Sequence, residues 1–556
     1  MLPALRNQLQ VLIENSLSEY PQVSIQSIPV QVEYTNDNTH GDLSCTVALR
    51  LSKVLKENPY DIALKINDRV QKKINGLPLK GKIKTVEVKK PGFINFFLEP
   101  AAFYDILYEV FTRKEDYGTS KMGEGQKIQI EFVSANPTGP LSVAHARQAA
   151  VGDALGNILE FAGFDVTKEY YVNDEGNQIN TLGRSIGLRA KEILGEPITF
   201  PEECYQGDYV RDLAKDFIER QHITKADQIK VEDFSIAHFG VEYLMAVISR
   251  ELKDFSVHFD VWSYQSKIAT DKNINAVLEL LEKKEMVYQY EGARWFKSTA
   301  FGDDKDRVVK KSDGSFTYLA PDIVYHQNKF ERGFSKIINI WGPDHHGYIP
   351  RIKAAVQALG HPGESLQVRI VQLATIYRDG KPLSMSTRRG QFISLREVIN
   401  EVGVDAARYF FLMRHLEAHL DFDLELAKKE TPENPVYYIQ YAHARIHSVI
   451  DFAGQSNLRP SPGPLQLLKE PSEIHLMRLI AYFPDMIDLC VQQLDPYALT
   501  SYLLDLATGF HKFYDQCRVV SEDLELSKER LALIQAAKIV LANGLKLLGV
   551  NTPTKM

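Results

Sequence analysis

Hydrophobic and polar positions follow the clearest pattern in residues 127–163. Apolar residues alternate with polar ones from Ile128 to Phe132, which is typical of a strand. Residues 134–140 are rich in turn formers, and the two prolines among them exclude regular structure. Apolar residues then recur at close to helical spacing over residues 143–161. We therefore predict a strand, a loop and a helix, in that order.

A strand that leads through a loop into a helix is the unit with which Rossmann-like domains bind phosphate. The helix N-terminus offers unpaired N–H groups and the positive end of a dipole to an anion. His145 lies in the first predicted turn, from which its ring can reach a nucleotide. The segment has neither a GxGxxG fingerprint nor a GxxxxGKS/T loop. An ordinary buried strand–helix unit without a ligand fits the same pattern.

A second strand with polar residues at its end is predicted further along the chain. Residues 337–341 form a short apolar run typical of a buried parallel strand, and residues 342–347, GPDHHG, turn off its carboxyl end. Ligands of open α/β sheets bind at such ends. A metal site is one alternative here, but no second pair of histidines or carboxylates has zinc-enzyme spacing. We favour hydrogen bonding of Asp344, His345 and His346 to a ligand.

The flanks of these units predict further domains. Residues 1–115 form an α/β module, with a helix over residues 2–18, two helices in residues 39–70 that break before Pro59, and two strands joined by a turn at Pro91. Residues 175–260 are mostly polar with helical periodicity, and residues 430–556 show helical periodicity nearly throughout. We expect the first of these stretches to be an insertion and the second to be a helical domain.

Composition limits the class of protein. At 556 residues the chain is too long for one core, and we expect about three or four domains. The chain shows no signal peptide and no run of membrane-spanning length, so we expect a cytoplasmic protein without a membrane partner. Its four cysteines are far apart and none forms a CxxC, which argues against a disulfide framework or a zinc knuckle. The net charge of −7 argues weakly against nucleic acid, although local basic patches decide binding.

Residues 134–147, SANPTGPLSVAHAR, resemble the first signature of class I aminoacyl-tRNA synthetases, His-x-Gly-His, in the surroundings typical of arginyl-tRNA synthetases. His145 matches the second histidine of that signature. Ser142 stands where the first histidine is expected, and Ala144 stands where the glycine is expected. Glycine at that position lets a nucleotide approach the backbone closely, so Ala144 adds a methyl group against the expected adenine.

Residues 384–388, Ser-Met-Ser-Thr-Arg, resemble the second class I signature, Lys-Met-Ser-Lys-Ser. Met385 and Ser386 match, whereas Ser384 and Thr387 replace the two lysines. A cation must still meet the charge that develops on the leaving pyrophosphate, and the nearest ones are Arg388, Arg389 and Lys381. The resemblance to arginyl-tRNA synthetases is most specific over residues 403–450, and in all it covers essentially the whole chain.

The resemblance implies roles for individual residues. Glu131 and Asp322 would bind the guanidinium of arginine, whose rigid fork of donors suits fixed carboxylates. Tyr318 would orient or cover it, and Asn136 would hold the α-amino or carboxylate end. The implied catalytic residues are His145, Ser142, Ser386 and Arg388. The implied ATP site comprises Ser134, Pro137, Gly139, His145, Gly342, Asp344, His345 and Met385. The implied tRNA contacts are Tyr437, Tyr441, Arg445, Tyr514 and Arg518.

The same resemblance implies a multidomain α/β fold. Residues 1–115 would be an N-terminal α/β domain that binds the tRNA elbow, where Lys80, Lys82, Lys84, Lys89 and Lys90 are candidate phosphate contacts. Residues 116–429 would be a class I Rossmann-like catalytic domain with a connective insertion at about 175–260. Residues 430–556 would be an all-helical anticodon-binding domain.

The implied activity is that of an arginine–tRNA ligase. ATP, as its Mg²⁺ complex, would activate arginine, and the 2′-OH of the terminal adenosine of arginine tRNA would accept it. The resemblance also implies that tRNA must bind before arginine is activated. We expect a monomer without a tightly bound metal, whose partners are arginine tRNA, L-arginine and ATP. Two alternatives stay open: another class I synthetase, and a non-catalytic tRNA-binding paralogue, which the departures at Ser142, Ala144, Ser384 and Thr387 would favour.

Overall fold

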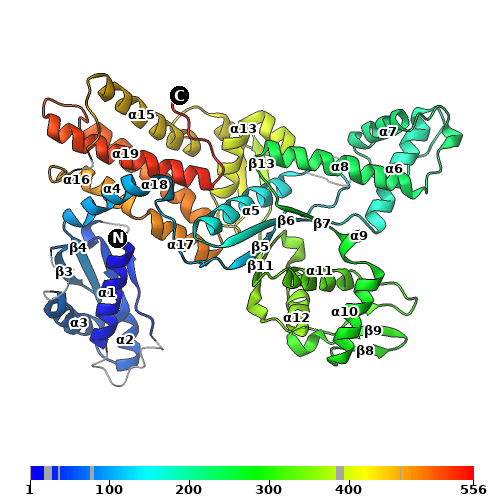
Figure 1. Ribbon diagram of the computed structural model, residues 1–556, viewed down its shortest axis with the longest axis horizontal. Coiled ribbons are helices and arrows are strands. Elements are labelled where there is room, and N and C mark those ends of the chain that lie inside the picture. The colour runs from blue at the N-terminus through cyan, green and yellow to red at the C-terminus, as the bar shows by residue number, and fades with distance from the viewer. Residues whose placement is uncertain are drawn as a thin grey trace.

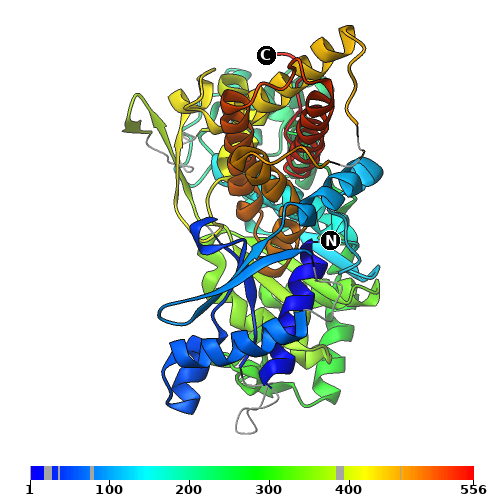
Figure 2. The same cartoon turned by 90° about the vertical axis from the view of Figure 1, so that its left-hand side faces the viewer.

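The computed structural model of the protein describes residues 2–17, 28–35, 38–74, 81–383, 393–461, 463 and 465–556. In Figure 1 a parallel sheet occupies the centre, the N-terminal domain lies at lower left and the C-terminal helices lie above that domain. A helical insertion extends to the upper right and a second lobe extends to the lower right. The view in Figure 2 again places the C-terminal helices above the N-terminal domain.

The N-terminal domain is a four-stranded antiparallel sheet, in the order β1-β2-β4-β3, with helices packed against it. Its elements are α1 (Leu2–Leu17), β1 (Val32–Tyr34), β2 (Leu43–Cys45), α2 (Val47–Leu55), α3 (Pro59–Ile74), β3 (Ile83–Lys89), β4 (Phe93–Leu98) and the connecting helix α4 (Ala101–Arg113). Helix α3 begins at Pro59 as predicted, because proline is well suited to a first helical position. The helix predicted from residue 39 is wrong at Leu43 and Cys45, which are buried in the inner strand β2.

The central sheet has five parallel strands in the order β12-β11-β5-β6-β7. The strands are β5 (Lys127–Glu131), β6 (Asp165–Val172), β7 (Val261–Tyr264), β11 (Lys336–Trp341) and β12 (Leu366–Ile370). The helices that connect them include α5 (Val143–Phe161), α9 (Gln265–Ile268), α11 (Leu319–Glu331) and α12 (Ile349–Leu359). The predicted strand, loop and helix are confirmed as β5, the loop after it and α5. The predicted strand over 337–341 is confirmed as β11.

The order of the strands determines where a ligand can bind. From β5 the chain proceeds to β6 and β7 on one side, and later to β11 and β12 on the other side. The sheet therefore has its topological switch point between β5 and β11, and open α/β sheets bind ligands at the carboxyl ends there. At that point Glu131 of β5 lies opposite Asn339 of β11.

Two segments extend from the sheet. The insertion consists of α6 (Asn177–Ile193), α7 (Asp208–Arg220) and α8 (Phe234–Asp254), which share a hydrophobic core of their own. The second lobe contains α10 (Asp271–Lys283) and an antiparallel sheet in the order β10-β9-β8, formed by β8 (Val287–Tyr290), β9 (Ala293–Phe296) and β10 (Arg307–Lys310). The second lobe shares a core with α11 and α12, and the sequence pattern did not separate it from the main domain.

The C-terminal part is helical, as predicted. A connector precedes it, with β13 (Ala374–Arg378), β14 (Lys381–Pro382), α13 (Leu395–Leu412), β15 (Leu420–Asp423) and α14 (Leu424–Lys428). The bundle consists of α15 (Pro435–Gln455), α16 (Pro471–Ala481), α17 (Phe483–Gln493), α18 (Tyr497–Gln516) and α19 (Leu524–Leu547). The fully buried Arg408 of α13 joins the parts, since it pairs with Asp153 of α5 at 2.6 Å and donates to the Leu548 carbonyl at 2.8 Å.

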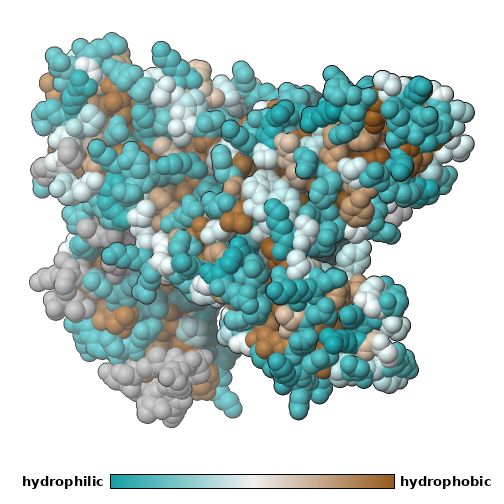
Figure 3. All heavy atoms as spheres, turned by 45° about the vertical axis from the view of Figure 1, so that its right-hand side comes forward, coloured by the Kyte–Doolittle hydropathy of each residue, from teal (hydrophilic) through white to brown (hydrophobic). Residues whose placement is uncertain are grey.

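The visible side of the molecule has no large apolar face among its described residues (Figure 3). On the side shown in Figure 3, hydrophobic residues form small areas dispersed among hydrophilic ones. Within the described ranges, no helix has the length and apolar character needed to cross a membrane.

Candidate active site

A cavity of about 790 Å³ opens at the carboxyl ends of β5 and β11. The loop after β5, the first turn of α5, the start of α11 and the turn after β11 all contribute to its wall. The site residues predicted from the sequence that line it are Glu131, Ser134, Asn136, Ser142, His145, Tyr318, Asp322, Gly342, Asp344 and His345. Residues more than 200 positions apart in the chain thus meet in one concave site.

Other predicted site residues lie elsewhere. Pro137 and Gly139 belong to the loop after β5 but are not among the residues that line the cavity. A methyl group at Gly139 would lie 3.3 Å from the ring of Tyr209, so this glycine faces the insertion. Met385, Ser386 and Arg388 lie outside the described residues, as do Ser384, Thr387 and Arg389.

The described residues that follow the second signature adjoin the first one. Val143 donates its N–H to the Ile393 carbonyl at 3.2 Å, and Leu395 donates its N–H to the Leu141 carbonyl at 2.8 Å. Residues 393–395 are therefore tied to the N-terminus of α5, where Ser142 occupies the cap position. Described residues shortly after the second signature thus contact the first signature at the N-terminus of α5.

Glu131 is already paired inside the protein. Lys329 of α11 is fully buried, and its Nζ lies 2.5 Å from Glu131 Oε2 and 3.0 Å from Asn339 Oδ1. Ser134 Oγ donates to the other carboxylate oxygen of Glu131 at 3.0 Å. The charge of Glu131 is thus balanced by a buried cation, which the sequence reasoning missed. No local signal marks Lys329, which follows the polar residues 326–328 in the sequence.

Asp322 has a different environment. It lies in the first turn of α11, and its Oδ2 accepts a hydrogen bond from a neutral donor, the Tyr348 hydroxyl, at 2.5 Å. Burial raises the pKa of Asp322 to about 6, with a further increase from the charge of Glu131, while the Tyr348 hydrogen bond and Lys329 act in the opposite direction. At neutral pH Asp322 is therefore a half-buried carboxylate paired to a neutral hydroxyl, and a bound cation would stabilise it.

Tyr318 and Asn136 lie at the opening of this pocket. Tyr318 is the residue before α11 and is 73% exposed, so its ring stands at the mouth of the cavity. Asn136 donates from Nδ2 to Gln178 Oε1 of α6 at 2.6 Å. This contact leaves the Oδ1 of Asn136 as the oxygen that a positively charged ligand group could meet.

His145 is neutral in this site. Its Nδ1 accepts the backbone N–H of Ser142 at 3.2 Å, so the ring proton of the neutral form is on Nε2. Burial lowers the pKa of His145 to about 4, and the charge of Asp344 opposes this shift only in part. His145 can therefore donate a hydrogen bond from Nε2 to a ligand at the N-terminus of α5, where the helix end also favours an anion.

The part of the wall at Gln372 is held by a buried arginine of α5 that the sequence reasoning did not single out. Arg147 is fully buried and donates to the carbonyls of Gln372 at 2.7 Å, Ala418 at 3.0 Å and His415 at 3.0 Å. Gln372 lines the cavity, so Arg147 fixes this part of the wall to α5. Asp344 and His345 lie exposed at the rim, 3.5 Å apart, in the 3-10 turn Pro343–Tyr348. The described residues include no group of three or more His, Cys, Asp or Glu side chains placed to hold a metal.

The predicted tRNA contacts gather on the helical bundle. The rings of Tyr437 and Tyr441 stack at 6.2 Å, and His511 of α18 stacks on Tyr441 at 5.8 Å. Arg445 lies over the ring of Tyr514 at 4.9 Å and donates to its hydroxyl at 2.9 Å. We call this set the aromatic row: Tyr437, Tyr441, His511 and Tyr514, with Arg445.

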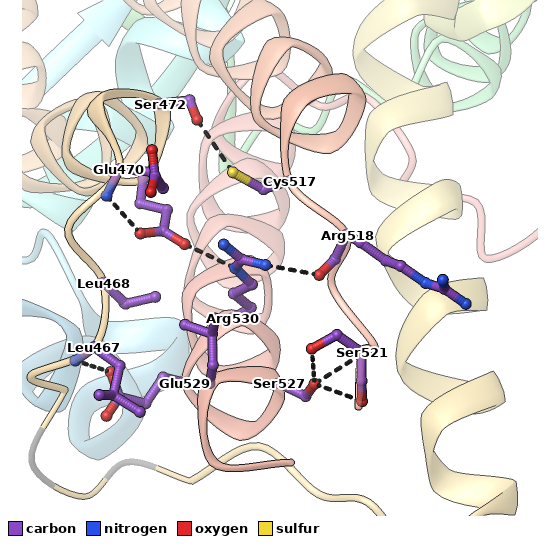
Figure 4. Close-up of polar contacts among 12 residues, drawn as sticks. Leu467, Leu468, Glu470, Ser472, Cys517, Arg518, Ser521, Ser527, Glu529 and Arg530 are labelled. Atoms are coloured by element: carbon purple, nitrogen blue, oxygen red, sulfur yellow. Dashed lines mark hydrogen bonds and ion pairs between the residues drawn. The ribbon is translucent and has the colours of Figure 1, made fainter. Parts of the chain in front are cut away.

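Arg518 lies just beyond α18. Its carbonyl accepts from Arg530 at 2.9 Å, and Arg530 in turn pairs with the buried Glu473 at 2.7 Å. Figure 4 shows the guanidinium of Arg518 directed away from this network. The backbone of Arg518 is therefore anchored, while its side chain is exposed.

Three family models match the chain. They are described as "Arginyl tRNA synthetase N terminal domain" over residues 7–98, "tRNA synthetases class I (R), catalytic domain" over residues 107–415 and "DALR anticodon binding domain" over residues 439–556. The parallel sheet, its switch-point cavity and the match to the catalytic domain define a class I aminoacyl-tRNA synthetase.

Similar proteins specify the family. An arginine–tRNA ligase of Geobacter sp. (strain M21) is 43% identical over 98% of both chains, and one of Desulfosudis oleivorans is 45% identical over 95% of both chains. The Thermus thermophilus arginyl-tRNA synthetase structure has the same fold, with a TM-score of 0.76 and 21% identity over 99% of this chain and 100% of that chain. The chain belongs to the arginyl-tRNA synthetase family. The resemblance and the fold class predicted from the sequence are confirmed, and the alternative of another class I synthetase is excluded.

Proposed function

We propose that the chain ligates L-arginine to arginine tRNA at the switch-point cavity, in two steps. The arginine carboxylate attacks the α-phosphate of ATP and pyrophosphate leaves in line. The 2′-hydroxyl of the terminal adenosine of the tRNA then takes the arginyl group. The observation that carries this proposal is the half-buried carboxylate of Asp322, which lines the same cavity as Ser142 and His145 at the N-terminus of α5.

Asp322 is the main partner of the guanidinium. Arginine stays charged at every relevant pH and presents donors in a fixed fork, so a half-buried carboxylate that lines the cavity suits it. Glu131 shapes the pocket and contributes negative potential, although Lys329 balances its charge. Asn136 Oδ1 accepts from the α-ammonium group, and Tyr318 covers the bound side chain at the mouth.

ATP binds at the other end of the cavity. His145 donates from Nε2 to the phosphate chain, and Ser142 and the first N–H groups of α5 add further donors. Ser134, Gly342, Asp344 and His345 surround the nucleotide, and Pro137 and Gly139 shape the loop beside it. ATP enters as its Mg²⁺ complex, with no metal held tightly by the protein. Met385, Ser386 and Arg388 contact the leaving pyrophosphate. The hydrogen bonds between residues 393–395 and the start of α5 support this role.

Transfer RNA binds across several domains. The anticodon bases contact the aromatic row and Arg518, because exposed rings and guanidinium groups stack well on unpaired bases. The N-terminal domain contacts the elbow of the tRNA. The domain limits that we propose are 1–115, 116–429 with the insertion at about 175–260, and 430–556. The protein works as a monomer in the cytoplasm.

The substitution Asp322→Asn tests the recognition of arginine. It keeps the volume and the hydrogen bond to Tyr348 but removes the negative charge. We expect kcat/KM for arginine to fall by at least about 100-fold, the order of 3 kcal/mol that a buried charged hydrogen bond contributes. The KM for ATP should stay within about twofold of the unsubstituted enzyme. A variant that still used arginine efficiently would refute this assignment.

A further inference from the structure

The turn that carries Asn136 is held from outside the central sheet. Residues 136–138 form a tight turn, since Thr138 donates its N–H to the Asn136 carbonyl at 2.7 Å. The turn joins β5 to α5 at the edge of the cavity. Two helices of the insertion contact it, and each does so through the second residue of the helix.

The first contact comes from α6. Gln178 accepts a hydrogen bond from Asn136 Nδ2 at 2.6 Å. An amide has one carbonyl oxygen and one NH₂ group, so the bond to Gln178 determines which of them faces the cavity. With the NH₂ group engaged, Asn136 presents its carbonyl oxygen, which can accept from an ammonium group but cannot donate to a carboxylate.

The second contact comes from α7. The hydroxyl of Tyr209 donates to the Thr138 carbonyl at 2.6 Å. The ring of Tyr209 lies against Gly139, where a methyl group would be only 3.3 Å from the ring carbon and the hydroxyl oxygen. Because Thr138 is itself bonded to Asn136, Tyr209 fixes the other end of the same turn.

The insertion can act as a unit on this turn. Helices α6, α7 and α8 share a hydrophobic core that includes Leu182, Val210, Leu213, Ile236 and Leu244, and Tyr209 packs against it. In Figure 1 these helices lie at the far right of the molecule and α8 leads back to the sheet. The position of this core relative to the sheet is therefore transmitted to the turn by Gln178 and Tyr209.

We infer that Gln178 and Tyr209 are positioning residues for the α-ammonium group of arginine. They hold Asn136 with its carbonyl oxygen toward the amino acid. Through them, the geometry of the amino-acid end of the cavity depends on the position of the insertion relative to the sheet. Neither residue touches the reacting atoms. The inference rests on the proposed function, because it assigns the ligand of Asn136 in that reaction.

The test compares three variants of the full-length protein in arginine-dependent ATP–pyrophosphate exchange with arginine tRNA present. Gln178→Met keeps the length of the side chain but removes the acceptor, and Tyr209→Phe removes only the hydroxyl. Tyr243→Phe is the matched control, since Tyr243 packs against the same core. We expect the KM for arginine to rise about three- to tenfold in each of the first two variants, the effect of one lost hydrogen bond. The KM for ATP, the kcat and the thermal unfolding midpoint should match those of Tyr243→Phe.

Each other outcome is informative. If the unsubstituted enzyme shows no exchange, the proposed function fails and the assignment to arginine fails with it. If the unsubstituted enzyme is active and both variants keep its KM for arginine, the inference is overturned while the proposed function stands. If the KM for arginine and the KM for ATP rise together in these variants and the unfolding midpoint falls, the contacts serve only the stability of the insertion. The inference is then likewise overturned.

Discussion

Asp322 is the residue on which recognition of arginine depends. Both oxygens of Glu131 have partners inside the protein, Lys329 and Ser134, whereas the half-buried Asp322 is paired with a neutral hydroxyl. Burial raises the pKa of Asp322 to about 6, so the ionised form is held at a cost while the pocket is without a cation. A guanidinium removes that cost, and a neutral analogue does not. Selectivity against analogues that lack the guanidinium follows from this arrangement.

The affinity for arginine should therefore depend on pH. Arginine binds the ionised form of Asp322, and the free carboxyl takes up a proton as the pH falls through about 6. We expect the KM for arginine to be constant above about pH 7 and to rise by up to about tenfold per pH unit below about pH 6. The KM for ATP is the internal control, because the pKa of His145 is about 4 and its ring stays neutral over that range. Exchange kinetics between pH 5 and 8 measure both values, and a flat KM for arginine would contradict the role of Asp322.

We expect Lys329 to be essential to the stability of the folded protein because it neutralises the buried Glu131. Lys329→Met leaves Glu131 buried without a cation, which costs about 3 to 5 kcal/mol. Urea unfolding measures this loss. The double variant Lys329→Met, Glu131→Gln carries neither charge, and we expect it to recover at least half of the loss. Equal stability of the single and double variants would show that the pair does not act as an ion pair.

Among single residues, the sequence predicted those whose side chains are chemically specific. Glu131, Asn136, Tyr318 and Asp322 stand at the positions that the resemblance implies, and all of them line one cavity. Lys329 could not be assigned, because its function depends on a partner 198 residues earlier in the chain. The wall contacts of Arg147 join residues 225 and more positions apart, which no local pattern encodes.

Among the elements, those with strong periodicity were predicted well. The helix over residues 143–161 and the strands at residues 128 and 337 have patterns that local geometry determines. Strand β2 was mistaken for helix because it is only three residues long and precedes a helix directly. The antiparallel sheet of the second lobe consists of four-residue strands, too short for periodicity to separate them.

Helix α15 supports a prediction about RNA. Tyr441 is partly exposed at the centre of the aromatic row, between Tyr437 and His511. Stacking of a base on an aromatic side chain contributes about 1 to 3 kcal/mol, so Tyr441→Ala should raise the KM for tRNA roughly 5- to 150-fold. The KM for arginine should not change. Tyr290→Ala, an exposed tyrosine on β8 of the second lobe, is the control, and an equal effect of both substitutions would argue against a specific contact.

For the whole molecule, charged pairs between distant segments fix the domains to one another. Arg478 of α16 pairs with the buried Asp42 of the N-terminal domain, 436 positions earlier in the chain. Arg6 of α1 pairs with Asp485 of α17 at 2.5 Å. The fold class of the parts could be read from changes of pattern along the sequence. The docking of these parts could not, because it depends on a shared hydrophobic core and on ion pairs between residues that no periodicity connects.

The most direct test of the proposed activity is arginine-dependent ATP–pyrophosphate exchange, run with and without arginine tRNA. We expect exchange when tRNA is present. That result would show that Ser142 and Ala144, together with the altered second signature, still support activation. Exchange without tRNA would support the enzymatic activity but contradict the expected dependence on tRNA. No exchange in either case, with binding of tRNA intact, would contradict the central claim and identify the chain as a non-catalytic tRNA-binding member of the family.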